Sequence, residues 1–487
     1  MLPKTTLVPA IVVGLLVLLY LLPLRAYFDT HTAVLFTNDT AVPVKNETAA
    51  NAVAVTVPNA TVTDDHERWY PDFAVLAEAN SVTVEQLQGK YATFSVERGL
   101  ELLRLMDADV RTELLWTQRP PNCKTARLAV MEMHISGFGS TWQQFVQFLM
   151  AAHSVVGGSM VVRGTWGYAN GCSFGNKSKS VDCYFELPTS CRVDDLAVSK
   201  KDKDDSERAE VSLGDARNHN RVVFLSKVTD FLLGSTEGHN LDYYPPKYHS
   251  FGVPFWRIRV NRFMLDSMRP DVRQAIEAKR AGIAWPSAGT PVIGIHIRRG
   301  DKVNEDFEMY SLDTYLARAL KLKEAHGARH VFIATDSAKE LQTILSLHTW
   351  TSMFEILYLN DTVRLGDQIT EAASETRRQQ DGYLHGLDVL SNLVLLSDAN
   401  YFVGSPHSNM ARVAVDWMDA KYNLLAPPEW IEFKTGADGV QYLPANGKQV
   451  ELASLYYATY NRTAMLEEVW CFQREKLGLD LPPAHCK

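Results

Sequence analysis

Hydrophobic and polar positions follow two alternating periods along the second half of the chain. Short apolar runs occur at 291–297, 330–335, 353–359 and 400–404, and stretches with helical spacing lie between and after them. Apolar runs of this length bounded by polar turns predict buried strands, and the intervening period predicts amphipathic helices. Strands that alternate with helices form a parallel, doubly wound sheet, so we expect the α/β fold class with a Rossmann-type domain.

The first half carries a related pattern with a helical segment in front. Residues 80–115 have helical spacing, "ARLAVMEMHI" reads as a strand, and "SGFGSTWQQFVQFLMAAH" reads as a glycine turn that opens a helix. Two more helices lead to the proline-rich "AWPSAGTP", which marks a boundary. We expect an N-terminal α/β domain with helical segments at 76–287, a Rossmann-like domain at 288–430 and a C-terminal extension at 431–487.

The N-terminus predicts a membrane anchor. Residues 7–24 contain no charge and are flanked by Lys4 and Arg25. Eighteen apolar residues are near the lower limit for a spanning helix, and no small-residue cleavage site follows them. We expect a cytoplasmic tail at 1–6, a signal anchor at 7–24 and a stem at 25–75, with the body in the lumen; a cleaved signal peptide is the alternative.

Glycosylation sequons and cysteines agree with a luminal body. The six Asn-x-Ser/Thr sequons are at Asn38, Asn46, Asn59, Asn176, Asn360 and Asn461. The six cysteines are Cys123, Cys172, Cys183, Cys191, Cys471 and Cys486. An even count beyond the anchor suits an oxidising compartment. We expect a Cys471–Cys486 bridge and another within the 172–191 cluster.

Polar side chains follow three of the predicted strands. His296, Arg298 and Arg299 end the first, Asp336 ends the second, and a Ser405–Asn409 turn follows the fourth. The carboxyl ends of parallel strands meet at one edge, where such sheets bind ligands. An arginine fork and backbone N–H groups at a helix start can bind a phosphate. The alternative is structural: Ser408 and Asn409 would cap a helix, and the arginines would form surface salt bridges with Asp301.

Two other motifs in the sequence suggest different functions. Arg299-Gly-Asp301 matches an adhesion tripeptide, but it follows a buried strand and not an exposed loop tip. Asp107-Ala-Asp109 could hold a divalent cation, yet it lies in or directly after a predicted helix. The net charge of −8 gives no reason to expect nucleic acid as a partner.

The motif "VIGIHIRRGDKV" resembles the donor-binding motif of the α1,6-fucosyltransferases, the family of core fucosyltransferase and rhizobial chitin-oligosaccharide fucosyltransferase. The α1,2- and protein O-fucosyltransferases are looser relatives. Further stretches agree in order: "GFGSTWQQFVQFLMAA", "VPFWRIRVNRFMLDSMRP", "FIATD" and "LSDANYFVGSPHSNMARVAVDWM". The resemblance covers about residues 125–420. It implies a GT-B-like fold of two α/β domains and GDP-fucose as the donor.

The resemblance also implies residue roles on the donor side. Arg298 would bind the β-phosphate, Ser408 with Asn409 would complete the phosphate turn, and His296 would lie against the guanine. Arg299 and Asp336 would also contribute to the donor site. The family's guanine-reading aspartate corresponds to Asn392 here, with Asp388 one turn away.

On the acceptor side, the resemblance implies a metal-independent, inverting single displacement. The family's general base corresponds to Asp306, with Glu305 and Glu308 close by, and Lys302 would polarise the base. Asp301, Lys302 and Tyr315 would form the acceptor side. No metal or other cofactor is implied.

The expected function is therefore fucose transfer from GDP-fucose to a glycan, α1,6-linked to the core GlcNAc of N-glycans, in the Golgi membrane. Two alternatives stay open: transfer to another glycan or a protein hydroxyl, and a catalytically silent, membrane-tethered glycan-binding protein. The expected partners are the donor, a glycan or glycoprotein acceptor and the membrane. The C-terminal extension contains no clear SH3 domain, and a homodimer stays open.

Overall fold

The computed structural model describes residues 95–133, 137–172, 180–193, 222–225, 245, 248, 251–299, 310–360, 371–406, 408–431, 434–435, 441–442 and 465–471. The chain divides into two compact units, Met1–Asp65 and His66–Lys487, and all described residues belong to the second. None of the helices described there is both long and apolar enough to cross a membrane. The expected anchor and stem lie outside the described residues, as do all the sequons except Asn360, which is exposed.

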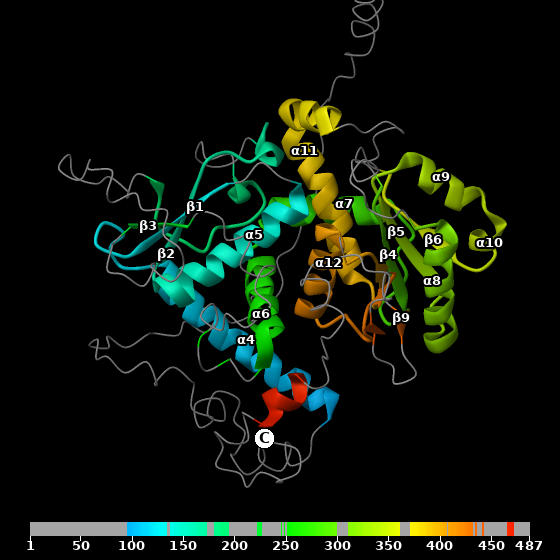
Figure 1. The fold of residues 1–487 in the computed structure, drawn as a ribbon, viewed down its shortest axis with the longest axis horizontal. Coiled ribbons are helices and arrows are strands. Elements are labelled where there is room, and N and C mark those ends of the chain that lie inside the picture. The colour runs from blue at the N-terminus through cyan, green and yellow to red at the C-terminus, as the bar shows by residue number, and fades with distance from the viewer. Residues whose placement is uncertain are drawn as a thin grey trace, which may run out of the picture. The chain divides into compact units, whose positions relative to one another are not determined.

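The first half contains a parallel sheet of three strands (Figure 1) in the order β2-β1-β3. Its strands are β1 (Leu128–Glu132), β2 (Ser159–Arg163) and β3 (Val222–Leu225). The helices here are α4 (Val96–Gln118) and α5 (Phe138–Ala151), followed by the short turns η1 (Ala152–Val156), η2 (Gly167–Ala169) and η3 (Val181–Cys183). The predicted strand–glycine–helix order is confirmed, because Gly137 is the N-cap of α5.

Two helices connect this half to the second sheet. They are α6 (Gly252–Asp266) and α7 (Pro270–Ala281), and α7 begins with Pro270 at a position where a missing N–H costs nothing. Both were expected from the sequence. The expected boundary near residue 288 falls between α7 and the next strand.

The second half is a doubly wound sheet with the strand order β6-β5-β4-β7-β8, and all its pairs are parallel. Its elements in chain order are β4 (Val292–Ile297), α8 (Leu312–His326), β5 (His330–Thr335), α9 (Ala338–Ser346), α10 (His348–Thr351), β6 (Glu355–Leu357), α11 (Glu371–Asp398), β7 (Tyr401–Gly404), α12 (Asn409–Ala420) and β8 (Glu429–Trp430). A small hairpin, β9 (Lys434–Thr435) with β10 (Gln441–Tyr442), follows. This alternation confirms the predicted α/β class.

The position of β4 in the middle of the sheet explains why its sequence is apolar except for His296. All six residues of β4 are buried, as expected for a central parallel strand covered on both faces. Helix α11 is interrupted at Asp381, whose φ/ψ angles are not helical. The sequence pattern predicts a helix only from residue 383, which agrees with the segment after this break.

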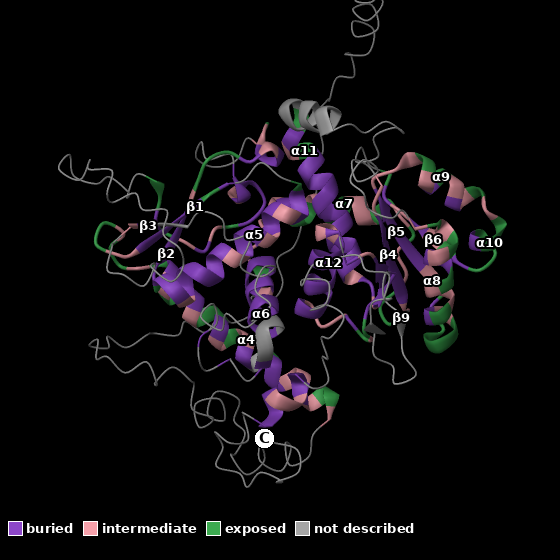
Figure 2. Ribbon diagram, viewed as in Figure 1, coloured by how far each residue is buried: buried purple, intermediate pink, exposed green. Residues whose placement is uncertain are grey.

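One apolar core extends across both halves. It includes residues of α4, α5 and α6 together with residues of α11, α12 and β5, and Figure 2 shows buried residues along each of these elements. Asn261 of α6 lies at its centre: its Oδ1 accepts hydrogen bonds from Nε1 of Trp142 (2.8 Å) and of Trp417 (3.1 Å). A buried polar atom shared by α5, α6 and α12 fixes the relative orientation of the three helices.

Disulfides stabilise the first half. Cys172 is bonded to Cys183, within the cluster where the sequence predicts a bridge. Cys191 of that cluster is bonded to Cys123, a pairing across 68 residues that was not predicted. Cys471 is also disulfide-bonded, and Cys486 lies outside the described residues.

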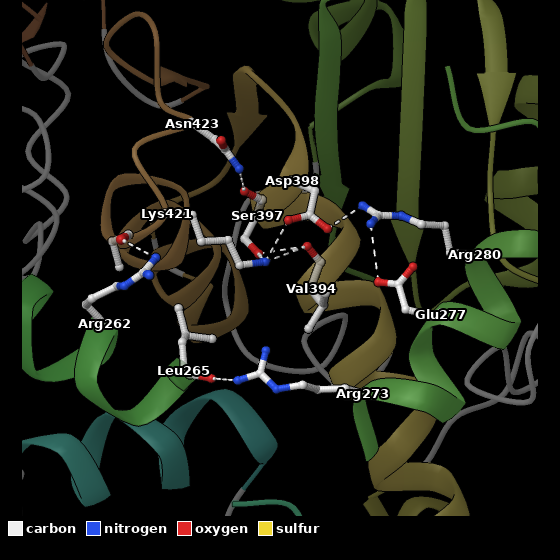
Figure 3. A network of polar contacts seen from close by, with 11 residues as sticks. Arg262, Leu265, Arg273, Glu277, Arg280, Val394, Ser397, Asp398, Lys421 and Asn423 are labelled. Carbon is white, nitrogen blue, oxygen red and sulfur yellow. Dashed lines mark hydrogen bonds and ion pairs between the residues drawn. The ribbon is translucent and has the colours of Figure 1, made fainter. Parts of the chain in front are cut away.

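A polar network joins α7, α11 and the end of α12 (Figure 3). Nζ of Lys421 donates to Asp398 Oδ1 (2.7 Å), Ser397 Oγ (2.6 Å) and the Val394 carbonyl (3.3 Å). Arg280 of α7 pairs with the second oxygen of Asp398. Burial lowers the pKa of Lys421, while the carboxylate of Asp398 opposes that change.

Candidate active site

The strand register brings three polar strand ends to one edge of the second sheet. Ile297 lies opposite Thr335 across β4 and β5, and Ile295 lies opposite Val403 across β4 and β7. The next residues along the strands, Arg298, Asp336 and Ser405, therefore follow at the same edge. In this strand order the connections reverse direction between β4 and β7, which is where open α/β sheets bind their ligands.

His296 points to the face of β4 that α11 covers. A side chain at Gly294 on that face would lie 3.2 Å from Leu396 and from Ala399, so the helix packs directly on the strand there. Two residues along a strand span the same length as about one turn of helix, which places His296 level with Asn392. His296 is buried, and burial, with a smaller effect of Arg298, lowers its pKa from 6.5 to about 3. The imidazole is therefore neutral at physiological pH.

Arg298 and the backbone of Arg299 share one carboxylate. Asp336 accepts a charge-assisted hydrogen bond from Arg298 Nη1 through one oxygen, and a bond from the Arg299 backbone N–H at 2.9 Å through the other. The Arg298 side chain is 32% exposed, so it is held in place and still accessible to a ligand. A fixed guanidinium at this edge can stabilise a phosphate or diphosphate.

The start of α12 lies against the start of α5. A Cβ atom on Gly139 would be 2.8 Å from the Met410 nitrogen and 2.9 Å from the Asn409 carbonyl carbon, so only glycine allows this approach. Ser408 is the N-cap of α12, but its side chain makes no capping hydrogen bond. The backbone N–H groups at the start of a helix favour an anion. The expected phosphate turn is therefore the N-terminus of α12, which follows β7, the strand next to β4 and Arg298. His407 lies outside the described residues.

Helix α11 presents a carboxylate and an amide on consecutive turns. Asp388 is buried and accepts a bond of 2.5 Å from Lys279 of α7. Asn392 is also buried, and its Nδ2 donates to the Asp388 carbonyl at 3.0 Å. The sequence pattern gives no signal for Lys279, because its partner is 109 residues away.

The residues predicted for proton transfer and the predicted acceptor-side residue Asp301 lie outside the described part of the chain. The proton-transfer candidates are Lys302, Glu305, Asp306 and Glu308, and all these roles stay predictions.

Tyr315 of α8 is buried, with its ring centre 5.8 Å from the Arg299 guanidinium carbon. The guanidinium of Arg299 therefore lies over the Tyr315 ring, which supports its position. The contact of Tyr315 with an acceptor stays a prediction.

The Asp-x-Asp alternative belongs to a different environment. Both oxygens of Asp107 accept bonds from Arg259 Nη1 at 3.0 Å, and Tyr422 donates to one of them. Asp107 therefore fixes α4 against α6 and the end of α12. In the described ranges, no group of three or more His, Cys, Asp or Glu side chains could hold a metal ion.

Comparisons with known proteins agree with the motifs of the site. Residues 98–425 match the family described as α-(1,6)-fucosyltransferase N- and catalytic domains. An α-(1,6)-fucosyltransferase of Drosophila melanogaster is 25% identical over 185 residues, which are 36% of this chain and 27% of that protein. The chain thus matches about a quarter of the length of this curated relative.

Solved fucosyltransferases are similar at a lower level. A NodZ α-1,6-fucosyltransferase soaked with GDP-fucose has 14% identity, covers 67% of this chain and 99% of its own, and has a TM-score of 0.35. POFUT1 in complex with GDP-fucose has 12% identity, with 64% of this chain and 99% of its own covered, and a TM-score of 0.36. The family match, by contrast, includes the first sheet, strands β4 to β7 of the second sheet and every described strand end of the site. This chain therefore belongs to the α-(1,6)-fucosyltransferase family.

Proposed function

We propose that this protein transfers fucose from GDP-fucose to a glycan acceptor. One observation carries the proposal: Arg298, which Asp336 holds in place, and the start of α12 lie at the same edge of a doubly wound sheet, at its switch point. A cation and a helix N-terminus at one edge suit the diphosphate of a nucleotide sugar. The GDP-fucose complexes of NodZ and POFUT1 support the choice of donor.

The reaction is a single displacement at the anomeric carbon. A carboxylate, Asp306 or Glu305, takes the proton of an acceptor hydroxyl, whose oxygen attacks fucose C1. The bond from C1 to the phosphate oxygen breaks, and GDP leaves with the electron pair. Arg298 and the N–H groups at the start of α12 stabilise the charge that develops on the diphosphate. None of these steps uses a metal, so we propose a metal-independent enzyme.

The guanine of GDP-fucose would lie over α11 and β4. The neutral imidazole of His296 adds no charge there, and Asp388 with Asn392 supplies a carboxylate and an amide on the neighbouring helix. An amide stands at residue 392, where the resemblance implies a carboxylate. Asp388, whose Oδ1 accepts from Lys279, supplies a carboxylate one turn earlier on α11.

The acceptor we propose is the core GlcNAc of N-glycans, with an α1,6 linkage. The family assignment and the Drosophila relative's name support this linkage. We also propose a type II topology in the Golgi membrane, which rests on the uncharged segment 7–24 and on the sequons that follow it.

The test is GDP release by the full chain, purified in detergent, with GDP-fucose, EDTA and a GlcNAc-terminated biantennary N-glycan. We expect release that depends on the glycan and persists in EDTA. Asp107→Asn serves as a matched control for the Asp-x-Asp alternative and should retain this activity once its stability has been checked.

Each other outcome has a distinct meaning. Binding of GDP-fucose without release for any glycan would point to a protein acceptor or to a silent binding protein. Release that stops in EDTA would refute metal independence. No binding of GDP-fucose would refute the proposal as a whole.

A further inference from the structure

A buried arginine lies in the first turn of α12, at the expected phosphate turn. Arg412 is 4% exposed, and its backbone N–H donates to the Ser408 carbonyl at 3.1 Å, as in a regular first turn. The dipole of a helix makes its N-terminus favourable for anions and unfavourable for cations. An anion bound at the same turn would offset the unfavourable effect on the guanidinium, so the position of Arg412 suits a site for an anionic ligand.

Arg412 determines which end of the Asn409 carboxamide is turned away from the helix. Its Nη2 donates to Asn409 Oδ1. A guanidinium has donors only, so it bonds to the oxygen of the amide and not to the nitrogen. The oxygen and the nitrogen of a planar carboxamide point in different directions, and Nδ2 is therefore directed away from Arg412. Asn409 is half-buried, which brings the amide, and not the buried guanidinium, within reach of a ligand.

The backbone that carries Asn409 is held by two neighbouring helices. A Cβ atom on Gly139 of α5 would lie 2.8 Å from the Met410 nitrogen, so α5 packs directly on this turn. Arg257 of α6 pairs with Asp416 farther along α12 at 2.9 Å. Because the backbone is held in this way, the direction of the Asn409 amide depends on the rotation of its side chain, which the bond to Oδ1 fixes.

We propose that Arg412 is a positioning residue for the diphosphate of the donor. It holds Asn409 Oδ1, so that the Nδ2 group donates to a phosphate oxygen at the start of α12. This rests on the proposed function, because the ligand is the diphosphate of GDP-fucose. Arg298, at the end of β4, would contact the diphosphate itself, whereas Arg412 acts through Asn409.

A double-mutant cycle on the full chain, with the Kd of GDP measured by calorimetry, tests this role. Arg412→Met and Asn409→Ala should each weaken GDP binding by about 10-fold, the value of one hydrogen bond to a charged group. If Arg412 acts through Asn409, the double variant should bind GDP no more weakly than Asn409→Ala alone. Arg412→Lys keeps a donor for Oδ1 and should recover part of the affinity.

Two controls separate this effect from a loss of structure. Arg257 is a second buried arginine, and it contacts α12 away from the phosphate turn. Arg257→Met should lower Tm and leave the Kd of GDP unchanged. Guanosine has no phosphate, so its Kd should be the same in the original protein, Arg412→Met and Asn409→Ala.

Each other outcome decides against a specific step. Losses that add in the double variant would overturn the proposal, because Arg412 would then act independently of Asn409. An unchanged Kd of GDP in Arg412→Met, or an equal loss for guanosine, would overturn it too. If the original protein binds GDP but transfers no fucose, the proposed function fails and the affinities still decide the role of Arg412. If it binds no GDP, the donor assignment fails and this inference fails with it.

Discussion

Replacing Asp398 by alanine should destabilise the protein far more than replacing Glu277, although both carboxylates pair with Arg280. Asp398 and Lys421 are each only 19% exposed, whereas Glu277 is 60% exposed. The Asp398→Ala variant leaves the Lys421 ammonium buried with only two neutral acceptors, Ser397 and Val394. Removing one partner of a buried pair costs about 3–5 kcal/mol, and an exposed pair contributes at most about 1 kcal/mol.

We expect a loss near the lower limit, about 3 kcal/mol, because a fifth of each side chain still contacts water. For a unit the size of His66–Lys487 this corresponds to a fall in Tm of about 3–4 °C. Urea denaturation followed by tryptophan fluorescence measures the free energy directly. The double variant Asp398→Ala, Lys421→Met removes both charges and should recover most of the loss. The reasoning is refuted if Asp398→Ala costs no more than Glu277→Ala, or if the double variant recovers nothing.

Three further predictions concern the site itself. Arg298→Lys should lower kcat/KM for GDP-fucose by about 10²–10³, because a lysine cannot form bidentate hydrogen bonds with a phosphate. A decrease smaller than 5-fold in the GDP-release assay would contradict this. The pKa of His296 is about 3 in the folded protein and about 6.5 for an unburied histidine, so the unfolded state binds the extra proton between these values. The free energy of unfolding should therefore fall by about 1.4 kcal/mol per pH unit as pH drops from 6.5 toward 3. Urea titrations at pH 7 and pH 4.5 measure the loss of unfolding free energy between these two pH values. His296→Gln should reduce this loss, and an equal loss in the variant and the original protein would show that His296 is not its cause. Gly139→Ala should displace the start of α12 and raise the KM for GDP-fucose, with a loss of about 1–3 kcal/mol in unfolding free energy; unchanged KM and stability would mean that the contact is not tight.

The elements of the second half could be predicted from sequence because their signals are local. Strand β4 is an apolar run interrupted only by His296, and α12 begins directly after a polar turn that follows β7. The order of strands then placed Arg298 and Asp336 at one edge, and their ion pair follows from the register.

Pairings between distant segments could not be predicted in this way. Glu340 of α9 forms an ion pair with Arg299, which follows β4, and Lys279 forms one with Asp388 across 109 residues. Cys123 forms a disulfide with Cys191 across 68 residues. The sequence pattern around Glu340 matches a capping box, so it predicts only the start of α9. That the carboxylate is directed elsewhere depends on Thr335, whose hydroxyl takes the N-cap N–H.

The apolar core that crosses the expected boundary near residue 288 limits how this protein can be divided. Residues 288–430 expressed alone would expose the face of α12 that α5 and α6 cover and the face of α11 that packs against η2 and α7. The indole N–H of Trp417 would also lose its acceptor, Asn261. We expect such a fragment to aggregate, and cooperative folding of it in isolation would contradict this. Hybrid enzymes that exchange acceptor preferences between relatives should therefore transplant α5, α6 and α12 as one block.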